Sequence, residues 1–279
     1  MKSTKKPLPI LKPRQVEILL LLHRFRYLSR PQIQAMLGHK TWAKVILWLN
    51  DLTDQHFIHR FYEPKLAGTP AVYCLDKASI RYLREFAIRD AEVELPKENP
   101  FYITDAQLKR IYREKALSAT FREHCLFLAD MYLSLQNDCK TFDSTLSFFS
   151  KTDIQDITYL PIPRPDAYFA ITRPKGEKER YLLEVFDPLP PRMVLRRRIW
   201  HYCNYYQEDY WQDNHPDTPF PHIILILPED RSKRYTARQI KKTVENESLE
   251  DDITFFVGTW QEAREKGIDW EVLTEVKVG

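Results

Sequence analysis

Two acidic residues, Asp166 and Glu184, have types and settings suited to holding a hydrated metal ion. Asp166 directly precedes an expected strand at 167–172, and Glu184 lies near the end of the next expected strand, 181–186. Carboxylates at adjacent strand ends supply the oxygen ligands that Mg²⁺ prefers, and such a metal activates water for phosphodiester hydrolysis. The sequence therefore offers Asp166 and Glu184 as catalytic candidates. Both are also candidate metal ligands, together with Glu123 from an expected helix.

A metal-dependent nuclease built on such a pair also uses a lysine two residues after the glutamate, and here that position is Phe186. The nearest cations belong to the following helix: Arg192, Arg196, Arg197 and Arg198. Arginine is a poor proton-handling substitute for lysine but a good phosphate clamp. Two interpretations stay open. Either geometry recruits a distant lysine to a nuclease site, or Asp166, Glu184 and Asp187 are strand-end acids that pair with the arginines.

The charges of the chain are divided unequally along its length. Residues 1–89 hold 16 Lys and Arg against 6 Asp and Glu. The whole chain holds 42 against 39, so residues 90–279 hold 26 against 33. Such asymmetry indicates a nucleic-acid-binding module joined to something else, although two ordinary solvated surfaces would also produce it.

The basic half has the element pattern of a winged helix-turn-helix, expected over residues 1–89. The expected elements are a helix from Pro13, a short helix capped by Ser29 and ended by Gly38, a helix at about 41–55, strands at 57–62 and 71–75, and a helix at 77–88. Such modules place the start of the third helix in the major groove of duplex DNA. The expected DNA-binding residues are Lys40, Thr41, Trp42, Lys44, Lys65 in the wing loop, and Arg196, Arg197 and Arg198. A small helical bundle for protein contacts is the alternative, with Trp42 as a packing residue.

The acidic half alternates strands and helices after an expected linker at 90–104. A helix is expected from Asp105 to about Asn137, followed by strands and helices in the order of the αβββαβ core of restriction-endonuclease-like, or PD-(D/E)XK-like, domains. The expected strands are 145–149, 167–172, 181–186, 222–227 and 253–257, and the expected helices are 192–212, 232–246 and 260–266. In the first of these helices Ile199, Tyr202, Cys203 and Tyr206 have the spacing of core residues. The overall expectation is an α+β chain of two domains, 1–89 and 105–279.

Several classes of protein are disfavoured by what the sequence lacks. No apolar run approaches the ~18 residues that span a bilayer, and no signal peptide is evident, which favours a cytoplasmic protein without membrane contact. The four cysteines are scattered without metal-binding spacing, so reduced thiols are expected. The six glycines form no phosphate-binding loop, which argues against nucleotide-dependent motors and Rossmann enzymes.

Five segments carry a resemblance to a known family: Thr41 to Ile58, Thr69-Pro70-Ala71-Val72-Tyr73-Cys74-Leu75, Arg164-Pro165-Asp166-Ala167, Leu183-Glu184-Val185-Phe186-Asp187, and the helix with Arg198 and Tyr202. Through them the chain resembles the replication-relaxation family, which is tied to replication and DNA relaxation of plasmids and other mobile elements. The resemblance covers roughly residues 12–230, and its motifs are loose. The chain departs from the family pattern at Phe186 and at Arg198, where a lysine is more usual.

The resemblance implies a winged helix fused to a restriction-endonuclease-like domain, and the departures at Phe186 and Arg198 indicate that this domain is degenerate. The implied function is that of a DNA-binding accessory or regulatory protein of a plasmid or other mobile element. Its implied partners are double-stranded DNA and the replication or relaxase proteins of the same element, and the sequence leaves a homodimer open. The alternative is an Mg²⁺-dependent DNA endonuclease, or nickase, targeted by its winged helix. No cofactor is expected apart from Mg²⁺ for an active nuclease site.

Overall fold

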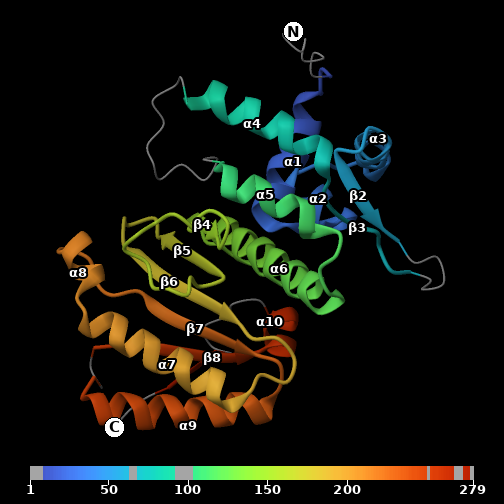
Figure 1. The fold of residues 1–279 in the computed structure, drawn as a ribbon. Helices are drawn as coiled ribbons and strands as arrows, with labels where there is room; N and C mark the ends of the chain where they lie inside the picture. The colour runs from blue at the N-terminus through green and yellow to red at the C-terminus, as the bar shows by residue number, and fades with distance from the viewer. Residues whose placement is uncertain (1–8, 63–67, 92–102, 250–251, 267–272, 277–279) are drawn as a thin grey trace. The chain divides into compact units, whose positions relative to one another are not determined.

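The computed structural model describes residues 9–62, 68–91, 103–249, 252–266 and 273–276. Within these residues the chain forms ten helices and two sheets, which confirms the expected mixture of α and β structure (Figure 1). Contacts divide the chain into two compact units, residues 1–126 and 127–279.

The first unit consists mainly of helices beside a small antiparallel sheet. Its elements are α1 (Pro13–Phe25), β1 (Tyr27–Ser29), α2 (Arg30–Met36), α3 (Trp42–Asp54), β2 (Ile58–Phe61), β3 (Val72–Leu75), α4 (Lys77–Ala91), α5 (Asp105–Glu114) and the start of α6 (Ala119–Thr141). The strand order is β1-β3-β2, with both pairings antiparallel. The expected helices and hairpin strands are therefore present, and the short strand β1 is an addition that the sequence did not indicate.

Local sequence explains where the first helices begin and end. Pro13 occupies the first turn of α1, where its missing N–H costs no hydrogen bond. Ser29 caps α2 through a capping box with Gln32, whose Oε1 accepts a 2.9 Å hydrogen bond from the Ser29 N–H. Gly38 follows α2 with a φ of +60°, a conformation that glycine adopts without steric cost. These signals fix the turn that leads into α3.

The expected single helix from Asp105 to about Asn137 is wrong, because the chain breaks between α5 and α6. The N-cap of α5 is Thr104, whose hydroxyl accepts a 3.2 Å hydrogen bond from the Gln107 N–H. Ser118 Oγ then accepts from the Phe121 N–H at 3.1 Å and starts a new helix. Side-chain capping therefore stabilises two separate helix starts where hydrophobic periodicity alone indicated one helix.

Helix α5 packs with the first unit, whereas the sequence assigned residues from 105 onward to the second domain. The buried carboxylate of Glu114 accepts hydrogen bonds from Arg26 Nε at 3.0 Å and from the terminal nitrogen Nη2 at 3.2 Å. The Tyr27 hydroxyl donates to the Glu114 carbonyl, and Lys115 Nζ pairs with Asp76 at 2.5 Å. The boundary drawn by contacts thus lies later than the expected linker at 90–104, most of which is outside the described residues.

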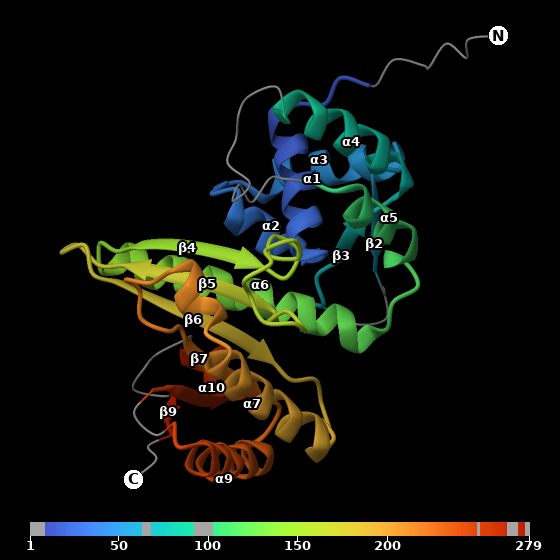
Figure 2. The same ribbon diagram turned by 60° about the vertical axis from the view of Figure 1, so that its left-hand side comes forward.

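The second unit is a six-stranded sheet with helices on both faces (Figures 1 and 2). Its elements after α6 are β4 (Thr145–Ser150), β5 (Ala167–Thr172), β6 (Lys178–Val185), α7 (Arg192–Gln207), α8 (Tyr210–Asn214), β7 (His222–Leu227), α9 (Asp230–Glu247), β8 (Phe255–Thr259), α10 (Trp260–Lys266) and β9 (Thr274–Glu275). The strand order is β4-β5-β6-β7-β8-β9. Strand β7 pairs in parallel with β6 on one side and with β8 on the other. The other three pairings, β4–β5, β5–β6 and β8–β9, are antiparallel.

Helices α7 and α9 cover one face of this sheet, and α6 packs on the other (Figures 1 and 2). Every residue of β7 from Ile223 to Leu227 is buried, as expected for a central parallel strand covered on both sides. The expected helix at 192–212 is interrupted at Asp209, which has a positive φ. The interruption places Trp211 of α8 in the core, where its indole N–H donates to the Pro219 carbonyl at 3.1 Å.

Candidate functional site

The structure brings Asp166 and Glu184 together on neighbouring strands. Asp166 directly precedes β5, Glu184 belongs to β6, and the register of the two strands pairs Ala167 with Leu183. The Asp166 N–H donates to the Leu183 carbonyl at 2.9 Å, and Asp166 Oδ2 accepts from the Val185 N–H at 3.0 Å. Strand pairing therefore fixes both the backbone and the side chain of Asp166 beside Glu184.

Helix α7 supplies two further groups, Arg198 and Tyr202, to this pair. Both donate to the same oxygen of Glu184, Oε1: the Arg198 guanidinium in a buried ion pair and the Tyr202 hydroxyl at 2.8 Å. Arg198 also donates from its other terminal nitrogen to the Pro163 carbonyl at 2.7 Å. Glu184, Arg198 and Tyr202 are all buried. An oxygen that accepts from two donors at once is typical of an ionised carboxylate.

Lys151 completes the cluster, and the sequence did not single it out. Its Nζ lies 3.1 Å from Asp166 Oδ1, and 57% of the side chain is exposed. Lys151 follows β4, whose register pairs Ser150 with Ala167, so the next position lies opposite Asp166. The Lys151 N–H accordingly donates to the Asp166 carbonyl at 2.8 Å. The antiparallel register of β4 and β5 is therefore what places Lys151 beside Asp166. The two strands are joined by the 16 residues 151–166, so no spacing along a single strand indicates this contact.

Burial and neighbouring charges shift the pKa values of these groups. Burial, with a contribution from the Asp166 charge, raises the pKa of Glu184, while Arg198 opposes that shift. Burial also raises the pKa of Tyr202, with a further contribution from Glu184. Partial desolvation beside the cluster would lower the pKa of Lys151, but the carboxylates of Asp166 and Glu184 outweigh it and raise that pKa. The lysine is therefore a cation at neutral pH and not a proton acceptor.

The donor set does not fit a divalent metal ion as it stands. Two carboxylates, Asp166 and Glu184, face two cations, Lys151 and Arg198, so their formal charges already cancel. A metal at Glu184 would have to displace the guanidinium from a buried oxygen. Within the described residues no group of three His, Cys, Asp or Glu side chains could hold a metal ion. The third expected ligand, Glu123, is exposed on a part of α6 that belongs to the first unit.

The DNA-contact candidates of the first unit lie at the exposed start of α3. Lys40, Thr41, Trp42 and Lys44 are all exposed, and the Trp42 side chain is not part of the core. The Arg30 guanidinium lies 5.9 Å from the Trp42 ring centroid. The opposite face of α3 packs inward through Val45, Leu49 and Leu52. Lys65, the remaining candidate of the basic half, lies outside the described residues.

The three consecutive arginines of α7 have different environments. Arg196 and Arg197 are exposed, whereas Arg198 is buried against Glu184. The expected DNA contact of Arg198 does not fit this position, because its guanidinium is already engaged. Successive helical residues differ by about 100° in direction, so one of three neighbours faces the sheet. The core positions expected in the same helix, Ile199, Tyr202 and Cys203, are confirmed, and Tyr206 packs against them.

The model of the replication-relaxation family matches residues 19–219, which is more than half of the chain. Neither the curated proteins nor the solved structures contain a match. In the ranges that the structure describes, no helix combines the length and apolar character needed to cross a membrane.

Proposed function

The chain belongs to the replication-relaxation family, and from that premise we propose that it is a DNA-binding accessory or regulatory protein of a plasmid or other mobile element. The family suggests a role in the replication and relaxation of such elements. In this proposal the first unit is a winged helix that binds duplex DNA. The second unit is a restriction-endonuclease-like domain that has lost its metal site and serves for docking. The replication or relaxase proteins of the same element are its proposed protein partners.

One observation carries the proposal of DNA binding: the first turn of α3 is exposed, basic and free of acidic residues. The order α1, β1, α2, α3, β2, β3 is that of a winged helix, in which this turn enters the major groove. Lys40 directly precedes the N-cap of α3 and Lys44 lies in its first turn, and residues 1–89 hold 16 Lys and Arg against 6 Asp and Glu. Phosphate contacts from such lysines supply sequence-independent affinity.

Replacing Lys40 and Lys44 together by glutamine should weaken binding to duplex DNA by about tenfold, because two phosphate contacts are lost. The slope of log affinity against log salt should fall by about 2, at ~0.9 for each lost contact. Fluorescence anisotropy of a labelled duplex across a KCl series measures both quantities. The matched control is Lys77→Gln with Lys109→Gln, which removes the same charge from exposed sites elsewhere in this unit. Equal binding by the two double variants would favour a protein-contact role for α3.

The charge balance of the Asp166–Glu184 cluster supports an accessory role over catalysis. Arg198 contacts Glu184 in the manner that a metal cation would. A guanidinium carries one positive charge and is not a Lewis acid, so it cannot lower the pKa of a water to generate the hydroxide that attacks a phosphodiester. Phe186 is buried in the core and offers no group that could orient a water.

A second candidate function, Mg²⁺-dependent DNA cleavage, is favoured by the position of Lys151. This lysine contacts Asp166 at 3.1 Å, so an aspartate, a glutamate and a lysine do lie in one cluster. Exposure of its side chain would let it reach a bound phosphate. Cleavage would require Arg198 to leave Glu184 before a metal could bind, and that step separates the two candidates experimentally.

Purified protein should leave supercoiled plasmid intact in the presence of Mg²⁺, and Asp166→Asn should behave as the wild type. The reason is that the cations of Lys151 and Arg198 already neutralise the two carboxylates. Agarose electrophoresis of the plasmid after incubation provides the measurement. Nicking by the wild type that disappears in both Asp166→Asn and Lys151→Gln, at equal folding, would identify the protein as a nuclease.

A further inference from the structure

Helices α7 and α9 are strongly basic within a unit that is acidic as a whole. Together they contain ten Lys and Arg against three Asp and Glu, whereas the rest of residues 127–279 contains ten against 23. Mixed surfaces normally intersperse charges of both signs, so segregation on this scale indicates a surface that meets an anion.

Eight of these ten cations are exposed, and within the described residues none of the eight is paired with a carboxylate. They form what is called here the α7–α9 face: Arg192, Arg196, Arg197, Arg231, Arg234, Arg238, Lys241 and Lys242. The other two cations have partners, Arg198 with Glu184 and Lys233 with Glu262. Because the eight exposed cations have no carboxylate partner among the described residues, the positive charge of the face is directed to solvent.

The two helices run in the same direction and are joined side by side. Arg196 Nε donates to the Tyr235 hydroxyl at 2.7 Å near their starts, and Gln207 donates to Glu247 at 3.1 Å near their ends. A groove between them contains two hollows of about 230 and 330 Å³. The first is lined by Arg192, Arg231 and Tyr235, among others, and the second by Arg196, Trp200 and Lys242, among others. Basic side chains thus border the groove on both helices.

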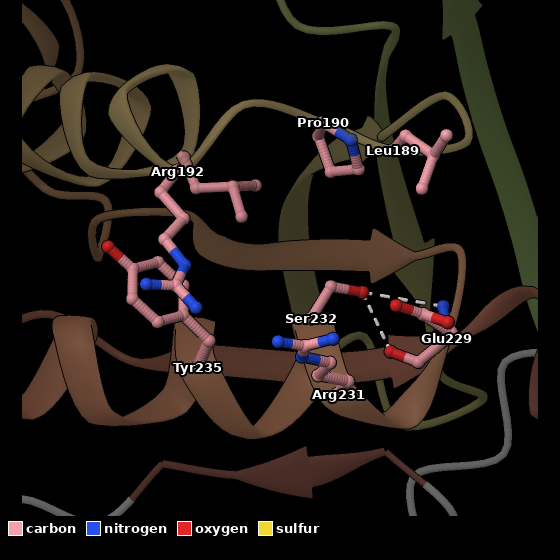
Figure 3. A pocket seen from close by; sticks show the side chains of 8 residues that line it. Leu189, Pro190, Arg192, Glu229, Arg231, Ser232 and Tyr235 are labelled. Carbon is pink, nitrogen blue, oxygen red and sulfur yellow. Dashed lines mark hydrogen bonds between the residues drawn. The ribbon is translucent and has the colours of Figure 1, made fainter.

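Figure 3 shows how the first hollow holds its arginines. Arg192 of α7 lies over the ring of Tyr235, with its guanidinium carbon 5.1 Å from the ring centroid. The Arg196 guanidinium carbon lies 5.9 Å from the same ring. Stacking orders the planar guanidinium while leaving N–H donors available to a phosphate. Each hollow also has one carboxylate in its lining: Glu229, which caps α9, in the first and Glu247 in the second. In each hollow the cations outnumber that carboxylate by two to one.

We propose that the α7–α9 face binds the phosphate backbone of duplex DNA, as a second contact separate from the one proposed for α3. The identity of the ligand rests on the proposed function, which makes DNA the polyanion that this protein meets. A row of cations suits a repeating anion better than a single small one. Arg231, Arg238 and Lys242 are seven and four residues apart, so they lie on one side of α9, with about 5.4 Å per helical turn. Arg192 and Arg196 provide a parallel row on α7.

The test uses the full-length chain and a labelled duplex of arbitrary sequence. The triple variant Arg192→Gln, Arg196→Gln, Lys242→Gln should bind at least about tenfold more weakly near 0.1 M salt, with a salt slope reduced by about 2–3. A matched triple, Lys140→Gln, Lys175→Gln, Lys178→Gln, removes the same charge from exposed sites outside the face and should bind nearly as the wild type. Thermal melting of both variants verifies that they fold.

Three results would overturn the proposal. The first is equal DNA binding by the two triple variants. The second is a loss confined to phosphatidylserine vesicles, which would assign the face to an anionic membrane. The third is a wild type that does not bind DNA, in which case the proposed function fails as well. If Lys40→Gln with Lys44→Gln weakens DNA binding and the groove triple does not, only this inference fails. A variant that carries both the double substitution in α3 and the triple substitution in the α7–α9 face should show the sum of the two losses in binding free energy, which would support two separate contacts.

Discussion

Replacement of Arg198 by methionine should lower the free energy of unfolding of the second unit by about 3–5 kcal/mol, because it leaves Glu184 as a buried charge without its partner. Glu184 and Arg198 are both buried, so water cannot take over the lost interaction. The side chain of methionine fills the space of the arginine stem without any charge or donor. The Tyr202 hydroxyl would remain as a donor to Glu184, and one neutral donor does not balance a buried carboxylate.

Thermal unfolding monitored by circular dichroism measures this loss, which amounts to about 10 °C in melting temperature at ~2–4 °C per kcal/mol. Arg197→Met is the matched control, since its side chain is the exposed neighbour of Arg198 in the same helix, and it should change stability by less than about 0.5 kcal/mol. Added Mg²⁺ should not raise the melting temperature of the wild type, because Arg198 already contacts Glu184. Similar stabilities of the two variants would contradict the buried ion pair.

The double variant Glu184→Gln with Arg198→Met should recover most of the stability lost in Arg198→Met. It removes both charges together, and neutral replacement of a buried pair is often close to neutral in stability. A double variant that is less stable than Arg198→Met would mean that the carboxylate finds another cation, for which Lys151 is the nearest candidate.

Patterns along the chain predicted most of the elements and the meeting of the two acids. Short runs of β-branched, aromatic and other apolar residues located β4, β5 and β7 to within a residue at each end, because such residues favour strands. The positions of Asp166 and Glu184 beside neighbouring strands were likewise predictable from their places at strand ends. The break between α5 and α6 was not predicted, because hydrophobic periodicity continues across it and only the capping role of Ser118 marks the new helix start.

The parts that sequence patterns missed depend on tertiary contacts. Lys151 was overlooked because the expected lysine lay on the strand of Glu184, whereas the structure supplies one across a hairpin register. Arg198 was grouped with Arg196 and Arg197 by adjacency, although its four-residue spacing from Tyr202 pointed to the buried side of the helix. The assignment of α5 to the first unit depends on Glu114 meeting Arg26, 88 positions away in the chain. No local pattern reveals such pairs.

Acid should destabilise the first unit through one buried histidine, His23 of α1. Burial, with a smaller contribution from the charge of Arg110, lowers the pKa of His23 to about 3. Arg110 comes from α5 and donates to the His23 carbonyl, so protonation would place two cations close together in the interior. Nε2 of His23 is buried and, among the described residues, has no hydrogen-bond partner. The folded unit therefore favours the neutral form of the His23 imidazole over the protonated form.

The direction of the effect follows from the two pKa values. In the unfolded chain His23 takes up its proton near pH 6.5, and in the folded chain only near pH 3. Between these values the unfolded state binds more protons, so stability falls as the pH falls below 6.5. At ~1.36 kcal/mol per pH unit, the loss between pH 6.5 and pH 4 is about 3 kcal/mol. Above pH 6.5 the contribution of His23 to stability is fully present.

Substitution of His23 by leucine should remove that acid-dependent loss, while at pH 7.5 stability should change little because the buried ring edge has no partner to lose. Urea unfolding of wild type and variant at pH 7.5, 6, 5 and 4 measures it, and the difference between the two curves isolates His23 because all other titrating groups are shared. His23→Asn serves as the polar control: it also cannot titrate, so it should flatten the pH dependence even if its packing is poorer. Parallel pH curves for wild type and both variants would show that His23 does not govern the acid stability of this unit.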